Sequence, residues 1–105
     1  MIVMFSSLSP DRQKLIRYMQ QLQFGKIINL LVVGGEPQVS DPLKGMKRYD
    51  TTRPMARKHS GKDFSLKREH ITFMKILDEI RDGIILLIKV SRGLPTIVET
   101  AESFT

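Results

Sequence analysis

Cysteine is absent from the 105 residues of this chain. Disulfides, thiolate-bound zinc sites and a cysteine nucleophile are therefore excluded, and such a composition is typical of a reducing compartment. Histidine is nearly as scarce, since the chain contains only His59 and His70. Little material is left for a catalytic triad or a metal site built from these residue types.

Long apolar segments are also missing. Residues 83–88 form the longest apolar run outside the N-terminus, and Lys89 ends it well short of the ~20 residues that a membrane span requires. Residues 1–5 are apolar, but they lack a basic region and are too short for a signal peptide. We therefore expect a cytoplasmic protein without membrane contact.

Positive charge is concentrated in the middle of the chain. Residues 43–68 contain nine of the seventeen Lys and Arg side chains and only two acids, Asp50 and Asp63. This stretch alone carries a larger positive excess than the whole chain, whose formal net charge is +6. The basic character of the protein is therefore local.

The sequence repeats itself. A shift of 58 positions places residues 15–39 on residues 73–97 without a gap, and apolar positions match throughout. The identical pairs are Gly25 and Gly83, Ile27 and Ile85, Val32 and Val90, Gly35 and Gly93, and Pro37 and Pro95. Glycine, proline and apolar positions that agree over such a length predict two copies of one structural unit.

Each copy begins with a predicted amphipathic helix. Ser9 is the expected cap of the first helix, with Pro10 at the first helical position, and Ser65 is the expected cap of the second. Apolar residues at spacings of three and four mark one face of each helix: Leu15, Met19 and Leu22, then Phe73, Leu77 and Ile80. Gly25 and Gly83 are expected to end the helices in the left-handed conformation.

A β-hairpin is predicted after each helix. Strands over residues 26–33 and 84–91 lead into the tight turns Gly34-Gly35 and Arg92-Gly93. The returning strands begin near Pro37 and Pro95, so they should start at an edge or at an unpaired position.

The expected fold class is α+β. Two αββ repeats with pseudo-two-fold symmetry form a four-stranded antiparallel sheet with two helices on one face. Residues 1–105 form a single domain in this interpretation. It consists of repeat 1 (8–40), a basic linker (41–63) and repeat 2 (64–102).

Comparison of the two copies assigns the faces of the strands. One face is apolar in both copies and should meet the helices: Ile28, Leu30, Val32, Leu86, Ile88 and Val90. The other face is mixed: Ile27, Asn29, Leu31 and Val33 in one copy, Ile85, Leu87, Lys89 and Ser91 in the other. Its candidate interface residues are Ile27, Leu31, Val33, Ile85 and Leu87. Two alternatives stay open, a homodimer through this face and an ordinary outer surface.

Part of the second copy resembles the short YezD-type bacterial proteins. The resemblance rests on Leu77-Asp78-Glu79-Ile80, Gly83-Ile84-Ile85, the Arg92-Gly93 turn and the tail at residues 97–102. It implies a helix that ends at a glycine, a hairpin and a Glu-rich strand end. That family usually has one such unit where this chain has two, and it implies no activity.

The basic linker is the main candidate for function. It lacks helix or strand periodicity and combines Lys and Arg with one tyrosine, a composition that can neutralise phosphates and stack on an exposed base. The candidate residues are Lys47, Arg48, Tyr49, Arg53, Arg57, Lys58 and Lys62. We expect a non-catalytic module that binds nucleic acid or another polyanion. The alternative is a protein–protein or oligomerisation scaffold with an inert, solvated linker.

An enzymatic function is not supported by the remaining titratable residues. His59 lies in the linker, and His70 is expected on the surface of the second helix, where its neighbour Glu69 points elsewhere. Three acids near the end of that helix form either a cation site or a solvated acidic face: Asp78, Glu79 and Asp82. We expect no enzyme, no cofactor and no metal.

Overall fold

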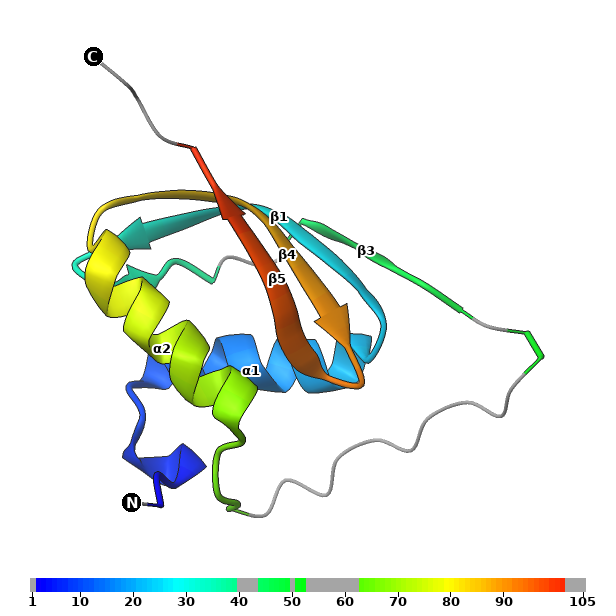
Figure 1. Cartoon of the computed structure of the whole chain (residues 1–105), viewed down its shortest axis with the longest axis horizontal. Coiled ribbons are helices and arrows are strands. Elements are labelled where there is room, and N and C mark those ends of the chain that lie inside the picture. The colour runs from blue at the N-terminus through cyan, green and yellow to red at the C-terminus, as the bar shows by residue number, and fades with distance from the viewer. Residues whose placement is uncertain (1, 40–43, 50, 53–62, 102–105) are drawn as a thin grey trace.

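Two helices lie on one side of a curled antiparallel sheet in the computed structural model (Figure 1), which describes residues 2–39, 44–49, 51–52 and 63–101. The elements in chain order are the 3-10 turn η1 (Phe5–Ser7), α1 (Pro10–Leu22), β1 (Gly25–Val33), β2 (Glu36–Pro37), β3 (Gly45–Lys47), α2 (Arg68–Ile80), β4 (Gly83–Ser91) and β5 (Leu94–Thr100). The predicted α+β class with antiparallel hairpins is confirmed. None of the helices in these described ranges is long and apolar enough to cross a bilayer.

The strand order is β2-β1-β4-β5, and β3 also pairs with β1. Every pairing is antiparallel. The prediction of four strands is wrong, because residues 45–47, which we placed in an aperiodic linker, form a fifth strand. Three residues are too few to show the alternation by which a strand is recognised in a sequence.

The start of α1 is as predicted, and the start of α2 is not. The Ser9 hydroxyl accepts the Arg12 backbone N–H at 3.3 Å, as an N-cap does. Ser65, the predicted cap of α2, instead forms a β-bridge with Met4, and Lys67 is the N-cap. The N-terminal segment keeps Ser65 extended, which delays the helix.

The ends of both helices also differ from the prediction. Both helices stop before the expected glycines, and the capping residues Gln23 and Arg81 each take a positive φ of 60° with ψ of −63° and −66°, which is not the left-handed helical conformation. Each hairpin turn then docks on the other helix. The N–H of Gly35 donates to the Arg81 carbonyl at 2.7 Å, and the N–H of Gly93 donates to the Gln23 carbonyl at 2.9 Å.

The core lies between the helices and the concave side of the sheet. Phe5, Leu15, Ile16, Met19, Leu22, Ile27, Leu30, Val32, Leu66, Phe73, Met74, Leu77, Ile85, Ile88 and Val90 are its buried apolar residues. His70 is buried beside them with 3% of its surface exposed, so its predicted position on the helix surface is wrong. Burial lowers the pKa of His70, and the Gly93 backbone and the charge of Glu69 offset this only in part.

The alternation of inward and outward residues breaks at the centre of both long strands. In β1, Asn29 takes a left-handed φ of 54°, so the buried positions Ile27 and Leu30 are three residues apart. In β4, the pairing with β5 shifts between Ile85 and Leu87, and the same spacing of three results. The two irregularities coincide, so the register of β1 on β4 is unchanged across them.

Because the alternation breaks, the predicted assignment of residues to the two faces of the sheet is wrong in part. Ile27 and Ile85, which we placed on the outer face as interface candidates, are fully buried. Conversely, Leu86 was expected in the core and is exposed, and Ile28 is only half-buried. The inward positions beyond the break are confirmed, namely Leu30, Val32, Ile88 and Val90.

Replacement of Asn29 tests the role of its backbone conformation. A β-branched side chain is strained at positive φ, so Asn29→Val should lower the free energy of unfolding by about 1–2 kcal/mol. Asn29→Gly should be nearly neutral, because glycine adopts this conformation without strain. Urea unfolding followed by circular dichroism measures both. A Val variant as stable as the parent protein would contradict the account.

Candidate anion-binding groove

The strand β3 brings part of the basic linker against the sheet. Its close approach depends on two glycines, Gly25 and Gly45. A Cβ at Gly25 would lie 2.0 Å from the Met46 carbonyl oxygen, and one at Gly45 would lie 2.6 Å from that of Lys26. Backbone hydrogen bonds flank the strand on both sides, from the Arg48 N–H to the Phe24 carbonyl at 2.7 Å and from the Ile28 N–H to the Lys44 carbonyl at 3.1 Å.

The registers of three strands align side chains on the outer face of the sheet. Lys26 of β1 lies directly opposite Met46 of β3 on one side and opposite Lys89 of β4 on the other. Directly opposite residues in an antiparallel pair point to the same face, and so do residues two apart on one strand. Phe24 directly precedes β1 and Arg48 directly follows β3, and the Arg48 N–H donates to the Phe24 carbonyl, so these two residues form a second opposed pair next to Lys26 and Met46.

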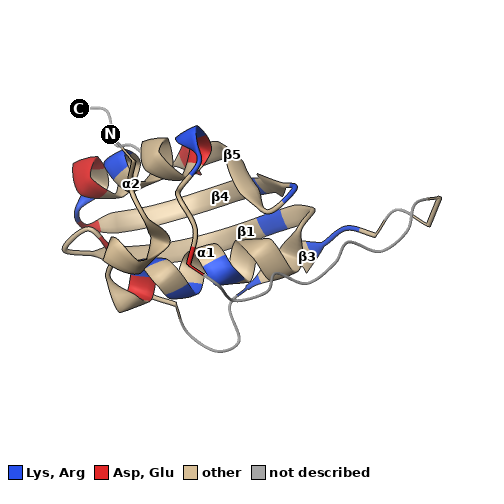
Figure 2. Cartoon of the chain, turned by 90° about the horizontal axis from the view of Figure 1, so that it is seen from below, with Lys and Arg blue, Asp and Glu red and all other residues tan. Residues whose placement is uncertain are grey.

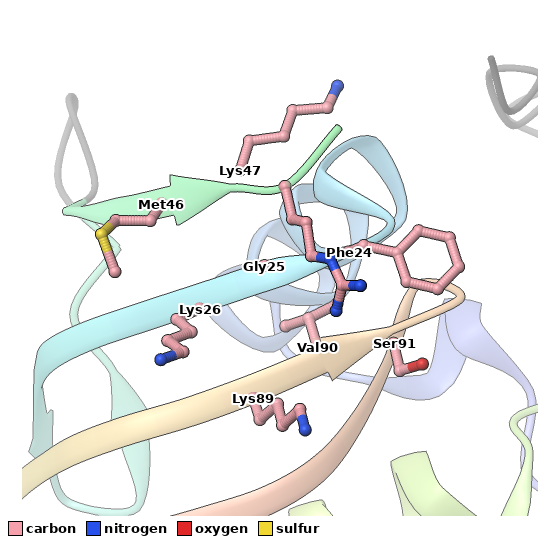
Figure 3. A pocket seen from close by; sticks show the side chains of 9 residues that line it. Phe24, Gly25, Lys26, Met46, Lys47, Lys89, Val90 and Ser91 are labelled. Atoms are coloured by element: carbon pink, nitrogen blue, oxygen red, sulfur yellow. The ribbon is translucent and has the colours of Figure 1, made fainter. Parts of the chain in front are cut away.

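A groove of about 370 Å³ lies at these residues. It is lined by Phe24, Gly25, Lys26, Met46, Lys47, Arg48, Lys89, Val90 and Ser91. Figure 3 shows Lys26 and Lys89 side by side on neighbouring strands, with Met46 on β3 and Phe24 at the start of β1. The groove therefore combines the basic side chains of Lys26, Arg48 and Lys89 with an apolar phenyl ring and a thioether.

Electrostatic repulsion is built into this groove. Lys26 and Lys89 face each other across β1 and β4, an arrangement that destabilises a sheet unless something compensates for it. Among the residues that the structure describes, no acid lines the groove, and the ion pairs found there all belong to Arg12. In Figure 2 the end of the sheet near β3 carries blue basic residues, whereas the red acidic residues lie on the helices and elsewhere. A bound anion would supply the missing compensation.

Two of the predicted phosphate contacts, Lys47 and Arg48, and the predicted stacking residue Tyr49 lie in the described part of the chain, and they differ in position. Arg48 lines the groove. The stem of Lys47 lines it as well, but the Lys47 ammonium donates to the Gln21 carbonyl at 3.2 Å and lies 5.1 Å from the centre of the Tyr49 ring. Tyr49 is 65% exposed beside it. The other candidates, Arg53, Arg57, Lys58 and Lys62, lie outside the described residues.

Sequence reasoning missed seven of the residues that line the groove, among them Phe24, Lys26, Met46 and Lys89. Lys26 and Lys89 are 63 positions apart in the chain and meet only through the register of β1 on β4. The alternation of β4 did place Lys89 on the outer face. Its partner could be identified only from the pairing of two remote strands, which no local pattern encodes.

The far end of the same outer face is apolar. Leu31 and Ile84 lie directly opposite each other and are 47% and 48% exposed. Val33 and Leu86 are also exposed nearby, while Leu87, another predicted interface residue, is half-buried. The two ends of one sheet face therefore differ in chemistry, with lysines at one end and aliphatic side chains at the other.

Two of the three acids at the end of α2, Asp78 and Asp82, have structural partners. Asp78 accepts the Arg12 Nη2–H at 2.5 Å, and Arg12 also donates to the Gly35 carbonyl at 2.9 Å. Asp82 accepts the Gly34 N–H at 2.9 Å. Within the described ranges no group of acids and histidines is arranged to hold a metal ion.

Comparisons with family models, with curated proteins and with solved structures find no match to this chain. The chemistry of the groove therefore has to be interpreted from its own residues.

Replacement of Gly25 tests whether β3 needs a close approach to β1. Gly25→Ala should displace β3, because the new Cβ would collide with the Met46 carbonyl. Amide hydrogen exchange at Ile28 and Arg48, whose N–H groups bridge the two segments, should become faster. The matched control is Gly83→Ala at the start of β4, where a Cβ would meet only the Ile80 side chain at 3.4 Å. Unchanged exchange in Gly25→Ala would refute the dependence.

Proposed function

We propose that this protein is a non-catalytic module that binds polyanions in the groove formed by β1, β3 and β4. The observation that carries the proposal is the Lys26–Lys89 pair, two like charges directly opposite on adjacent strands with Arg48 beside them. Directly opposed like charges destabilise a sheet. The described lining of the groove contains these basic side chains and no acid, which makes the site suited to phosphate or sulfate groups.

We further propose that the fold arose from two copies of one αββ unit. Several features support it. The bounds of α1 and α2, and those of β1 and β4, each differ by 58 positions, which is the shift that aligns the two copies in the sequence. The docking of each hairpin turn on the opposite helix end is reciprocal. The likeness of residues 77–102 to YezD-type proteins fits this proposal, since a single unit is usual there.

The proposed duplication relates the lysine pair in the groove to an aliphatic pair at the other end of the outer face. Under the same shift, Lys26 corresponds to Ile84, and Leu31 corresponds to Lys89. The Lys26–Lys89 pair and the Leu31–Ile84 pair thus occupy equivalent places at the two ends of the outer face. Because the fold tolerates aliphatic residues at one end, it does not itself require lysines at the other. A ligand-binding role accounts for the difference.

The remainder of the basic linker extends the same proposal. β3 delivers the segment that contains Lys47, Arg48 and Tyr49 to the groove, and four further basic candidates follow Tyr49 in the sequence. Together they would add positive charge to that of the groove, so that a long polyanion could contact the groove and these linker residues. Contacts of this kind depend on phosphate and not on base sequence, which favours weakly specific binding.

Fluorescence anisotropy with labelled DNA and RNA, titrated at two salt concentrations, tests the proposal. Binding should weaken steeply with salt, because each phosphate contact releases counterions. In the double variant Lys26→Ser, Lys89→Ser, the slope of log affinity against log salt should fall by about 1.4 for a single strand, at ~0.7 for each lost contact.

The matched control is Lys14→Ser, Lys75→Ser, which removes the same charge from exposed positions on the two helices. It should retain the salt slope of the parent protein. A variant with Arg53, Arg57, Lys58 and Lys62 changed to Ser should weaken binding to long chains. No binding at low salt would eliminate the proposal, and equal loss in the groove and control variants would place the contacts elsewhere.

A second candidate function is a protein-interaction scaffold that dimerises through the apolar end of the outer face. The observation that favours it is the exposed Leu31–Ile84 pair with Val33 and Leu86 beside it. Exposed apolar groups that adjoin one another are typical of association sites.

Light scattering at high protein concentration tests this scaffold function. A dimer should form, and Leu31→Lys should convert it to a monomer, because a charge would then be buried in the contact. Thr72→Lys, an exposed position on α2, is the matched control and should remain dimeric. A parent protein that stays monomeric would contradict the scaffold function and leave polyanion binding unaffected.

A further inference from the structure

We infer that the ligand of the groove is a single-stranded nucleic acid, with one unstacked base held beside Phe24 and Met46. This inference rests on the proposed function and narrows it from polyanions in general to one class. Polyanion binding alone does not explain the apolar part of the groove.

A site for phosphate or sulfate alone needs cationic side chains and backbone amides. The groove instead combines Lys26, Lys89 and Arg48 with a phenyl ring and a thioether. Phe24 lines the groove together with Arg48, and the Phe24 backbone carbonyl accepts the Arg48 N–H at 2.7 Å. An aromatic ring next to basic residues is the combination that single-strand binding proteins use, since a base stacks on the ring while its phosphates meet the charges.

The size of the groove also favours a single strand. Its volume of about 370 Å³ is at the lower end of the range for small-ligand pockets, about 300–1,000 Å³, and suits one nucleotide. A base in a duplex is stacked and paired, and its extrusion costs a few kcal/mol, whereas a base in a single strand is already accessible. The exposed ring of Tyr49, on the same segment as Arg48, offers a second stacking surface.

The distinguishing experiment compares three labelled probes on the full chain by anisotropy. They are a short oligothymidylate, an oligomer of the same length made of abasic sites, and a duplex of that length. The oligothymidylate should bind about five- to tenfold more tightly than the abasic oligomer, because stacking of one base is lost without the base. It should also bind more tightly than the duplex at equal salt.

Two variants locate the effect. Phe24→Leu should reduce oligothymidylate affinity to that of the abasic oligomer and leave the abasic affinity unchanged. Phe64→Leu, a half-buried phenyl that packs against Phe5 and does not line the groove, is the matched control and should keep the preference. Lys26→Ser together with Lys89→Ser should weaken both single-stranded probes.

The outcomes separate this inference from the proposed function. Equal affinity for the oligothymidylate and the abasic oligomer, or tighter binding of the duplex, would overturn the single-strand inference while polyanion binding stands. Failure of all three probes to bind at low salt would overturn both. The comparison of probes uses the parent protein, so it holds even where a variant fails to fold.

Discussion

The antiparallel register of β1 on β4 is the constraint on which the rest of this structure depends. It pairs Ile27 with Ile88 and Leu30 with Ile85 in the core, and it sets Lys26 opposite Lys89 on the outer face. A slip of one residue would exchange the two faces and place lysines among the buried aliphatic residues. The coincident irregularities at Asn29 and in β4 preserve this register, and they also curl the sheet around the helices. The groove is therefore a consequence of the same pairing that forms the core.

Local signals in the sequence predicted much of the fold. The Ser9 cap, the helix faces, the two long strands and the two glycine-containing turns depend on residues within a few positions of one another, and they were found nearly where expected. The helix ends were missed because Gln23 and Arg81, and not glycines, take a positive φ after the last helical turn. The strand faces were missed in part because the alternation breaks at the centre of both long strands, at the positive φ of Asn29 in β1 and at the pairing shift in β4.

The candidate site was less accessible to sequence reasoning. Charge clustering pointed to the linker and identified Lys47 and Arg48, two of the residues that line the groove. It gave no indication that three linker residues form a strand, or that this strand lies beside Lys26 and Lys89. Those facts depend on contacts between segments remote in the chain, which require the register and the close approach at Gly25 and Gly45. We therefore propose that polyanions bind in a groove that the linker completes, and not to the linker alone.

The central claim is that polyanions bind in this groove and not over the whole basic surface. Amide chemical-shift mapping tests it most directly, with the isotope-labelled protein titrated by a short oligothymidylate. The account predicts that the largest shifts cluster at residues 24–26, 46–48 and 89–91, where the three strands meet. Shifts that are confined to the helices, or to the apolar end at Leu31 and Ile84, would contradict it.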